Sequence, residues 1–282
     1  MSKFEGKVAV ITGAGSGIGR ALALQLAREG AKLAISDVNI IGLDETAAAA
    51  RALGAEVHTA TLNVAEREAV LTYADDVARH FGTVNMIFNN AGIAYTGDVE
   101  VSEFKDIERI MDVDFWGVVN GTKAFLPHLI ASGDGHVVNI SSLFGLVAIP
   151  SQSAYNSAKF AVRGFTEALR MEMITNGHPV KVTCVHPGGI KTAIARTATA
   201  AEGTDAASLG EFFDKRLART SPEAAARRIL TDVRRNRARC LIGLDARALD
   251  LFQRITGSGY QRFFAATAGR IMKQAGQASK VS

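Results

Sequence analysis

Short, uninterrupted apolar runs alternate along this chain with longer segments that have the apolar spacing of helices. An uninterrupted apolar run of this length is typical of a strand buried on both faces, as in a parallel sheet covered by helices. The alternation predicts a doubly wound α/β fold with one parallel seven-stranded sheet and helices on both faces. The expected strands are 7–12, 32–36, 56–62, 84–89, 135–141, 180–186 and 239–242, and the expected helices are 17–29, 43–53, 66–81, 103–131 and 153–175.

The composition does not break before residue 190, so we expect a single domain over residues 1–282, with its core in residues 1–192. Residues 193–210 are small, polar and weakly patterned, which in a compact domain is typical of a mobile lid or a disordered loop. We expect a lid, a helix and the last strand in residues 193–243, and a helical extension in residues 244–282. The extension carries two apolar sets, separated by Gly257 and Gly259: Leu249, Phe252 and Ile255, then Tyr260, Phe263, Phe264 and Ile271.

The composition excludes several classes of protein. Two cysteines, Cys184 and Cys240, are too few for a disulfide scaffold, and no Cys or His cluster has the spacing of zinc ligands, so no metal site is expected. No apolar segment approaches the ~18 residues of a membrane span, and the first residues do not have the pattern of a signal peptide. These observations favour a soluble, cytoplasmic protein in a reducing compartment.

The formal net charge of +4 is distributed unevenly along the chain. Residues 211–282 hold 15 Lys and Arg against 6 Asp and Glu, whereas residues 1–210 hold 17 against 22. A slightly acidic body argues against a nucleic-acid partner, which would need a basic binding face. For the basic tail, the simpler interpretation is a solvated helix face, and the alternative is contact with a membrane surface or an anionic lipid-like substrate.

A glycine-rich turn follows the first expected strand and leads directly into the first expected helix. It reads TGAGSGIG over residues 12–19, and its glycines allow a tight turn and close packing of the helix on the sheet. At such a junction a pyrophosphate can approach backbone N–H groups at the positive end of the helix. The alternative is a glycine-rich turn without a ligand. The pattern predicts dinucleotide binding by Gly13, Ser16, Gly17, Ile18 and Gly19.

Asp37 follows the second expected strand, at the distance from Gly19 where a dinucleotide site places an acidic residue. Such a residue can accept hydrogen bonds from the adenosine ribose hydroxyls, and its charge would repel a 2′-phosphate. No Lys or Arg occupies residues 14–16 or 38–39 to bind that phosphate. We therefore predict NAD rather than NADP as the cofactor; the alternative is that Asp37 merely caps a turn.

Ser142, Tyr155 and Lys159 form a second chemical pattern. Tyr155 and Lys159 are four residues apart in a helical segment, so they share one helix face. A phenol with a pKa near 10 is a poor base at neutral pH, but a neighbouring ammonium and an oxidised nicotinamide favour its phenolate. Tyr155 could then exchange a proton with a substrate oxygen that Ser142 also contacts. The alternative for Tyr155 and Lys159 alone, a common surface pair, is disfavoured by their position after the fifth strand.

In combination, the motifs resemble the short-chain dehydrogenase/reductase family from about Lys7 to about Thr192. Residues 12–19 are similar to the family's TGxxxGxG turn, residues 89–92 to its NNAG motif, and residues 186–192 to its PG…T segment. The resemblance implies a Rossmann-type fold, a catalytic Ser142–Tyr155–Lys159 group, and hydride transfer between a nicotinamide ring and a carbonyl or alcohol carbon. It also implies cofactor contacts at Asn90, Ala91, Gly92, Tyr155, Lys159, Pro187, Gly188, Ile190 and Thr192.

The chain departs from the family pattern at two places. Asp114 stands where the family usually has a fourth catalytic residue, an Asn whose backbone carbonyl binds a water that relays protons to the lysine. Asp can supply the same carbonyl, so we expect activity to survive, although a carboxylate there could alter the pH dependence of the relay. Asn63-Val64 replaces the Asp-Val that commonly borders the adenine, and Asn63 can still offer an oxygen and an NH₂ group to it.

The resemblance places residues 143–149, 93–95 and the lid at 193–218 around the substrate. Residues 143–149 are mostly apolar, which favours a lipophilic secondary alcohol or ketone; the alternative places some of them in the core or in an interface. The resemblance also implies a homodimer or homotetramer formed through the helices near 103–131 and 153–175. The main functional prediction is an NAD(H)-dependent oxidoreductase, and the alternative is a catalytically weak NAD-binding regulatory protein.

Overall fold

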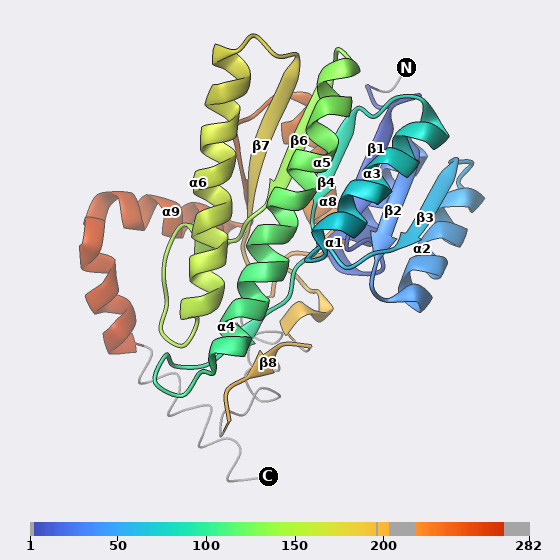
Figure 1. Cartoon of the computed structure of the whole chain (residues 1–282). Helices are drawn as coiled ribbons and strands as arrows, with labels where there is room; N and C mark the ends of the chain where they lie inside the picture. The colour runs from blue at the N-terminus through green and yellow to red at the C-terminus, as the bar shows by residue number, and fades with distance from the viewer. Residues whose placement is uncertain (1–2, 196, 203–217, 268–282) are drawn as a thin grey trace.

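A computed structural model describes residues 3–195, 197–202 and 218–267, and its centre is a parallel sheet. The seven strands of this sheet are β1 (Val8–Thr12), β2 (Lys32–Asp37), β3 (Val57–Thr61), β4 (Met86–Asn89), β6 (Gly135–Ile140), β7 (Val180–Pro187) and β9 (Arg239–Ile242). Their order is β3-β2-β1-β4-β6-β7-β9, so the chain builds outward from β1 in one direction and then in the other (Figure 1). The predicted doubly wound sheet is confirmed, with all seven expected strands.

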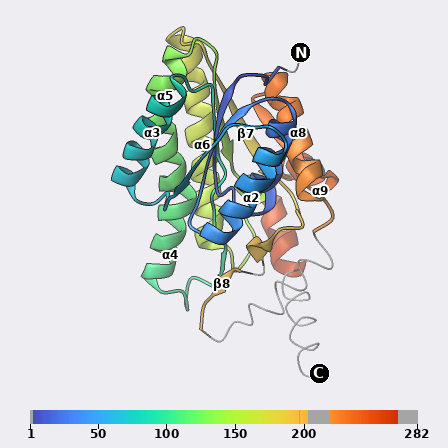
Figure 2. The ribbon, with the colours of Figure 1, turned by 90° about the vertical axis from the view of Figure 1, so that its right-hand side faces the viewer.

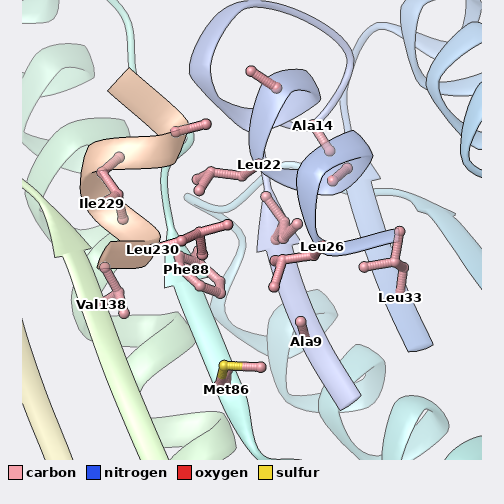
Figure 3. Close-up of a cluster of buried hydrophobic side chains, with 14 of the residues drawn as sticks. Ala9, Ala14, Leu22, Leu26, Leu33, Met86, Phe88, Val138, Ile229 and Leu230 are labelled. Atoms are coloured by element: carbon pink, nitrogen blue, oxygen red, sulfur yellow. The ribbon is translucent and has the colours of Figure 1, made fainter. Parts of the chain in front are cut away.

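One face of the sheet is covered by three helices, which are α1 (Gly17–Arg28), α2 (Ile40–Ala52) and α8 (Pro222–Arg234). Figure 2 shows α2 and α8 on the same side of the sheet. In Figure 3, Leu22 and Leu26 of α1 lie near Leu230 of α8 and Phe88 of β4, in one cluster of buried side chains. Each such side chain contributes roughly 1.5–3 kcal/mol on burial, so this face is a main source of stability.

The opposite face is covered by α3 (Arg67–Phe81), α5 (Gly117–Ala131) and α6 (Ser153–Thr175). Phe125 of α5 is fully buried here and meets Tyr73 of α3 edge-on, with ring centroids 5.9 Å apart. Because helices cover both faces, a strand such as β1 is buried at all five of its positions. This explains why β1 reads as a nearly continuous apolar run rather than as an alternating one.

The helical stretch expected over 103–131 is confirmed, but it is not α-helical throughout. The segment forms α4 (Phe104–Met111), then a π-helical turn at Asp112–Trp116, and then α5. A single π-turn within α-helix is frequent at functional sites, because it shifts the directions of the side chains around it. Here Asp114 is fully buried, while Asp112 is exposed.

A second, two-stranded parallel sheet pairs β5 (Tyr95–Thr96) with β8 (Thr199–Ala200). Figure 1 shows β8 at the end of the molecule that also carries α4. Part of the 193–210 segment, expected to be a lid or a disordered loop, is therefore ordered as β8 and a 3₁₀ turn at Ala193–Ala195. Residues 203–217 of the expected lid lie outside the described residues.

Beyond β9, the chain continues into α9 (Leu244–Thr256), a 3₁₀ turn at Gly257–Gly259 and a helical stretch at 260–267, as the two glycines predict. In Figure 1 α9 lies at the edge of the molecule on the side of α6. Ile271 and the rest of the tail lie outside the described residues, so contact of the basic tail with a membrane surface stays a prediction. No helix among the described residues is long and apolar enough to cross a membrane.

Candidate active site

The glycine turn lies where the strand order of the sheet reverses. β1 pairs with β2 on one side and with β4 on the other, and ligands of such sheets bind in the crevice at this switch point. Gly13 has a φ of +65°, and a Cβ atom there would lie 2.7 Å from Ala91 Cα. A Cβ on Gly19 would overlap the carbonyl oxygen of Gly13. Both positions therefore require glycine, and the turns after β1 and β4 lie in direct contact.

The amino end of α1 has the features of a phosphate site. Ser16, its N-cap, makes no side-chain cap hydrogen bond within the described residues, so N–H groups of the first turn keep their donor capacity. Such N–H groups at the positive end of a helix bind phosphate. Gly17 has a φ of +52°, and a Cβ there would lie 3.1 Å from Thr192 Cγ2. Ile18, in the same first turn, packs against the core. The available N–H donors at the positive end of α1 suit a dinucleotide pyrophosphate.

Thr12 and Asn90 fasten the two turns to each other. Asn90 Nδ2 donates to the carbonyl oxygens of Thr12 and Gly13 at 2.9 and 3.1 Å. In return, Thr12 Oγ1 accepts from the backbone N–H groups of Asn90 and Ala91 at 3.0 and 3.1 Å. These four bonds hold the crevice in a defined shape before any ligand binds.

Asp37 lies at the end of β2 and reaches into the glycine turn. Its Oδ2 accepts from the backbone N–H of Gly15 at 2.7 Å, and its Oδ1 accepts from that of Asn39 at 2.9 Å. These are the bonds of a turn cap, as the alternative interpretation expects. An ionised carboxylate has about four acceptor sites, so both oxygens can still accept from a ribose hydroxyl.

Asn63 and Val64 follow β3 at the same edge of the sheet. Asn63 is exposed, accepts from the backbone N–H of Ala65 at 3.2 Å and donates to Glu66 at 3.1 Å. Val64 is buried, and its carbonyl oxygen accepts from Asn120 Nδ2 at 3.0 Å. The Asn63 side chain thus shapes its own turn and lies where solvent or a ligand can reach it.

The segment after β7 lies beside the glycine turn. Pro187 is the last residue of β7, and the backbone N–H of Gly188 donates to Ile242 O at 2.9 Å. Ile190 is buried, and the backbone N–H of Thr192 donates to Ile190 O at 2.8 Å. Because Thr192 also faces Gly17, the structure brings the two predicted cofactor segments together.

Ser142, Tyr155 and Lys159 converge just beyond β6. Ser142 Oγ accepts from the backbone N–H of Phe144 at 3.1 Å, which caps the 3₁₀ turn at Leu143–Gly145. Lys159 Nζ lies 5.5 Å from the centroid of the Tyr155 ring. Burial raises the pKa of Tyr155 above its ordinary value, and the Lys159 ammonium and the Ser142 hydroxyl oppose this increase. A phenol, an ammonium and a hydroxyl thus share one site beside the crevice.

A family model described as short chain dehydrogenase matches residues 7–203. The chain belongs to the short-chain dehydrogenase/reductase family, and it is an oxidoreductase of that family. It is 68% identical over 271 residues to SadH of Mycobacterium tuberculosis, covering 96% of this chain and 98% of that protein. It is 39% identical over 191 residues to human estradiol 17-beta-dehydrogenase 11, covering 66% of this chain and 63% of that one.

The fold agrees with solved structures of short-chain dehydrogenases/reductases. One from Burkholderia phymatum, in complex with NAD, matches with a TM-score of 0.85 at 30% identity, covering 93% of this chain and 97% of that one. The Rossmann-type fold implied by the sequence motifs is therefore confirmed.

Asp114, which the sequence resemblance placed at the family's fourth catalytic position, forms a buried ion pair. Its Oδ2 lies 3.0 Å from Lys159 Nζ, and its Oδ1 accepts from the backbone N–H of Ile93 at 2.8 Å. Burial raises the pKa of Asp114. Burial alone would lower the pKa of Lys159, but Asp114 and Tyr155 raise it by more. Lys159 Nζ also donates to Ile140 O at 3.3 Å, so the pair is fixed from both sides.

The sequence predicted no role for the side chain of His186, which supports Ser142. Its Nδ1 lies 3.0 Å from Ser142 O, and its ring is buried. Burial lowers the pKa of His186 to about 4, so the ring is neutral at pH 7 and its Nδ1–H donates to the carbonyl. The signal in the sequence was its place at the end of an expected strand, 180–186. The structure adds that this strand, β7, lies next to β6.

Proposed function

We propose that this chain transfers a hydride between NAD(H) and the carbon of a secondary alcohol or ketone. The observation that carries the proposal is the convergence of Ser142, Tyr155 and Lys159 beside the crevice that contains the glycine turn. The nicotinamide of the cofactor supplies or accepts the hydride when bound. The glycine turn, Asp37 and the 187–192 segment would hold it.

Tyr155 is the general acid and base in this proposal. In alcohol oxidation its phenolate takes the hydroxyl proton, and in ketone reduction its phenol returns a proton to the carbonyl oxygen. Lys159 favours the phenolate by its charge, and Ser142 donates a hydrogen bond to the reacting oxygen. Asp114 and the Ile140 carbonyl hold the ammonium of Lys159 in place.

The proposal is tested by following NADH absorbance during incubation with a panel of ketones, and NAD reduction with the matching secondary alcohols. Turnover of at least one pair supports it. Tight NAD binding without turnover of any member would favour the alternative of a regulatory protein.

We expect NADH to bind about tenfold more tightly than NADPH, because the Asp37 carboxylate would face a 2′-phosphate of the same charge. Arg20 offers that phosphate little compensation, because its guanidinium binds the carbonyls of Gly15 and Gly42 and pairs with Glu45. Fluorescence titration measures both dissociation constants. Asp37→Asn should reduce the difference between the dissociation constants of NADH and NADPH. Asp44 is an exposed acid on α2, and Asp44→Asn should leave that difference unchanged. Equal or tighter binding of NADPH to the wild type would refute the NAD preference.

A lipophilic substrate is supported by part of the expected pocket lining. Leu146 and Val147 are fully buried in a cluster with Tyr260, so the core alternative applies to them. Phe144 packs edge-on against Tyr155, with ring centroids 6.1 Å apart, and Ile93 packs in the cluster that includes Tyr155. The likeness to a protein named for estradiol supports the same class. In the ketone panel, KM should fall as the alkyl groups lengthen, and a constant KM would refute the proposal.

A homodimer or homotetramer is proposed through α6 and its neighbours. Phe160 and Trp116 are exposed apolar residues, at 37% and 43%, and Gly164 leaves room beside Phe160 for a partner helix. Light scattering measures the molar mass, and therefore the number of subunits, of the wild type and of Phe160→Glu. A monomeric wild type would contradict the proposal.

A further inference from the structure

The C-terminal helices pack against the loops that border the candidate active site. We call α9 and the helical residues 260–267 the C-terminal unit. Its residues Ala246 and Tyr260 are buried in one cluster with Leu143, Leu146 and Val147, which directly follow Ser142. Leu249, Phe252 and Phe264 pack against the same cluster. The inner face of the unit is thus part of the support for the 143–149 loop.

Asp245, in the first turn of α9, contacts the loop expected to hold the nicotinamide. Its Oδ2 accepts from the backbone N–H of Gly189 at 2.7 Å. A Cβ atom on either Gly188 or Gly243 would overlap the Asp245 carboxylate. Two glycines therefore leave the room that this carboxylate occupies. A charge-assisted bond to a backbone N–H is among the stronger hydrogen bonds, so it can define the position of the loop.

Tyr260, at the start of the second helix of the unit, contacts the other loop. Its hydroxyl oxygen accepts from the backbone N–H of Ala148 at 3.2 Å, and the residue is buried. On the opposite side, Asn156 of α6 donates to the carbonyl oxygens of Phe144 and Val147 and accepts from the Ile149 N–H. Asn156 is the neighbour of Tyr155, so the 143–149 loop is held between the catalytic helix and the C-terminal unit.

We propose that Asp245 and Tyr260 are positioning residues through which the C-terminal unit sets the two walls of the active site. Asp245 positions residues 187–192 for the cofactor, and Tyr260 positions residues 143–149 for the substrate. Neither side chain contacts Tyr155 or Lys159 in the described structure, so each acts through the loop it binds. This inference depends on the proposed function only for what the two loops bind, the cofactor and the substrate. The contacts of Asp245 with Gly189 and of Tyr260 with Ala148 do not depend on it.

Hydrogen–deuterium exchange of the ligand-free protein tests the two contacts separately. We expect Asp245→Ala to speed exchange at the Gly189 amide, and Tyr260→Phe to speed it at the Ala148 amide, each about fivefold, the effect of one lost hydrogen bond. Asp245→Asn, whose amide oxygen can still accept, should retain most of the protection. Matched controls are Glu223→Ala, an exposed acid in the first turn of α8, and Tyr73→Phe, a buried tyrosine on α3.

Ligand binding provides the second readout. Asp245→Ala should raise the Kd of NADH about fivefold and leave the substrate KM at saturating cofactor close to that of the wild type. Tyr260→Phe should raise the substrate KM and leave the Kd of NADH unchanged. A general loss of stability would instead change both constants in both variants, and that result would overturn the proposal.

The exchange result separates this proposal from the proposed function. If the wild type binds no nicotinamide cofactor, the proposed function fails, while faster exchange confined to the expected loops would still support the positioning roles. Wild-type exchange at Gly189 in Asp245→Ala, and at Ala148 in Tyr260→Phe, would overturn the inference.

Discussion

Replacing Tyr155 by Phe is expected to lower kcat by about 100- to 10,000-fold, the usual contribution of a positioned general acid or base. The substitution removes only the hydroxyl. The ring stays in place, because it packs edge-on against Phe144 and lies beside Lys159. We therefore expect the Kd of NADH to change little. Steady-state kinetics on whichever ketone the wild type reduces, together with fluorescence titration of NADH, measures the two quantities.

Tyr73→Phe is the matched control for this variant, because it removes a hydroxyl from a different tyrosine, which is buried on the face of α3 that packs against α5. Its kcat should equal that of the wild type. Retention of more than about a tenth of wild-type kcat in Tyr155→Phe would be incompatible with the proton-transfer role of the phenol.

The strands could be predicted because each carries its own signal. β1 is buried on both faces, so its residues Val8–Thr12 are apolar apart from the last, and no knowledge of distant residues is needed to recognise them. The glycine turn also carries a local signal, since a Cβ on Gly19 would overlap the carbonyl oxygen of Gly13 in the same turn. Such a glycine can be predicted from the residues that surround it in the sequence. The fold then brings the predicted cofactor segments together.

Features that depend on tertiary packing were missed or misplaced. The π-helical turn at Asp112–Trp116 has no signature in composition, and the pairing of β5 with β8 joins residues about a hundred positions apart. Leu146 and Val147 read equally well as pocket or core, and the position of the C-terminal helices decides for core. For β5, Leu146 and Val147 the deciding partner lies far away in the sequence, where periodicity carries no information.

The replacement of the family's usual Asn by Asp114 is expected to be measurable in the pH dependence of alcohol oxidation. The rate should rise with pH as Tyr155 loses its proton, because the phenolate is the base. The Asp114 carboxylate raises the pKa of Tyr155, since a negative charge nearby disfavours a second one. Asp114→Asn removes that charge, so the midpoint of the rise should move to lower pH.

Asp112→Asn is the matched control, because Asp112 lies in the same π-helical turn with an exposed side chain, and its midpoint should not move. Asp114→Asn also leaves the Lys159 ammonium buried without its countercharge, so a lower free energy of unfolding, by about 3–5 kcal/mol, should accompany the shift. If Lys159 instead lost its proton, its positive charge would no longer favour the Tyr155 phenolate. The midpoint of the pH dependence would then rise. An unchanged or higher midpoint would therefore show that Asp114 does not act on Tyr155 as a negative charge beside a retained ammonium.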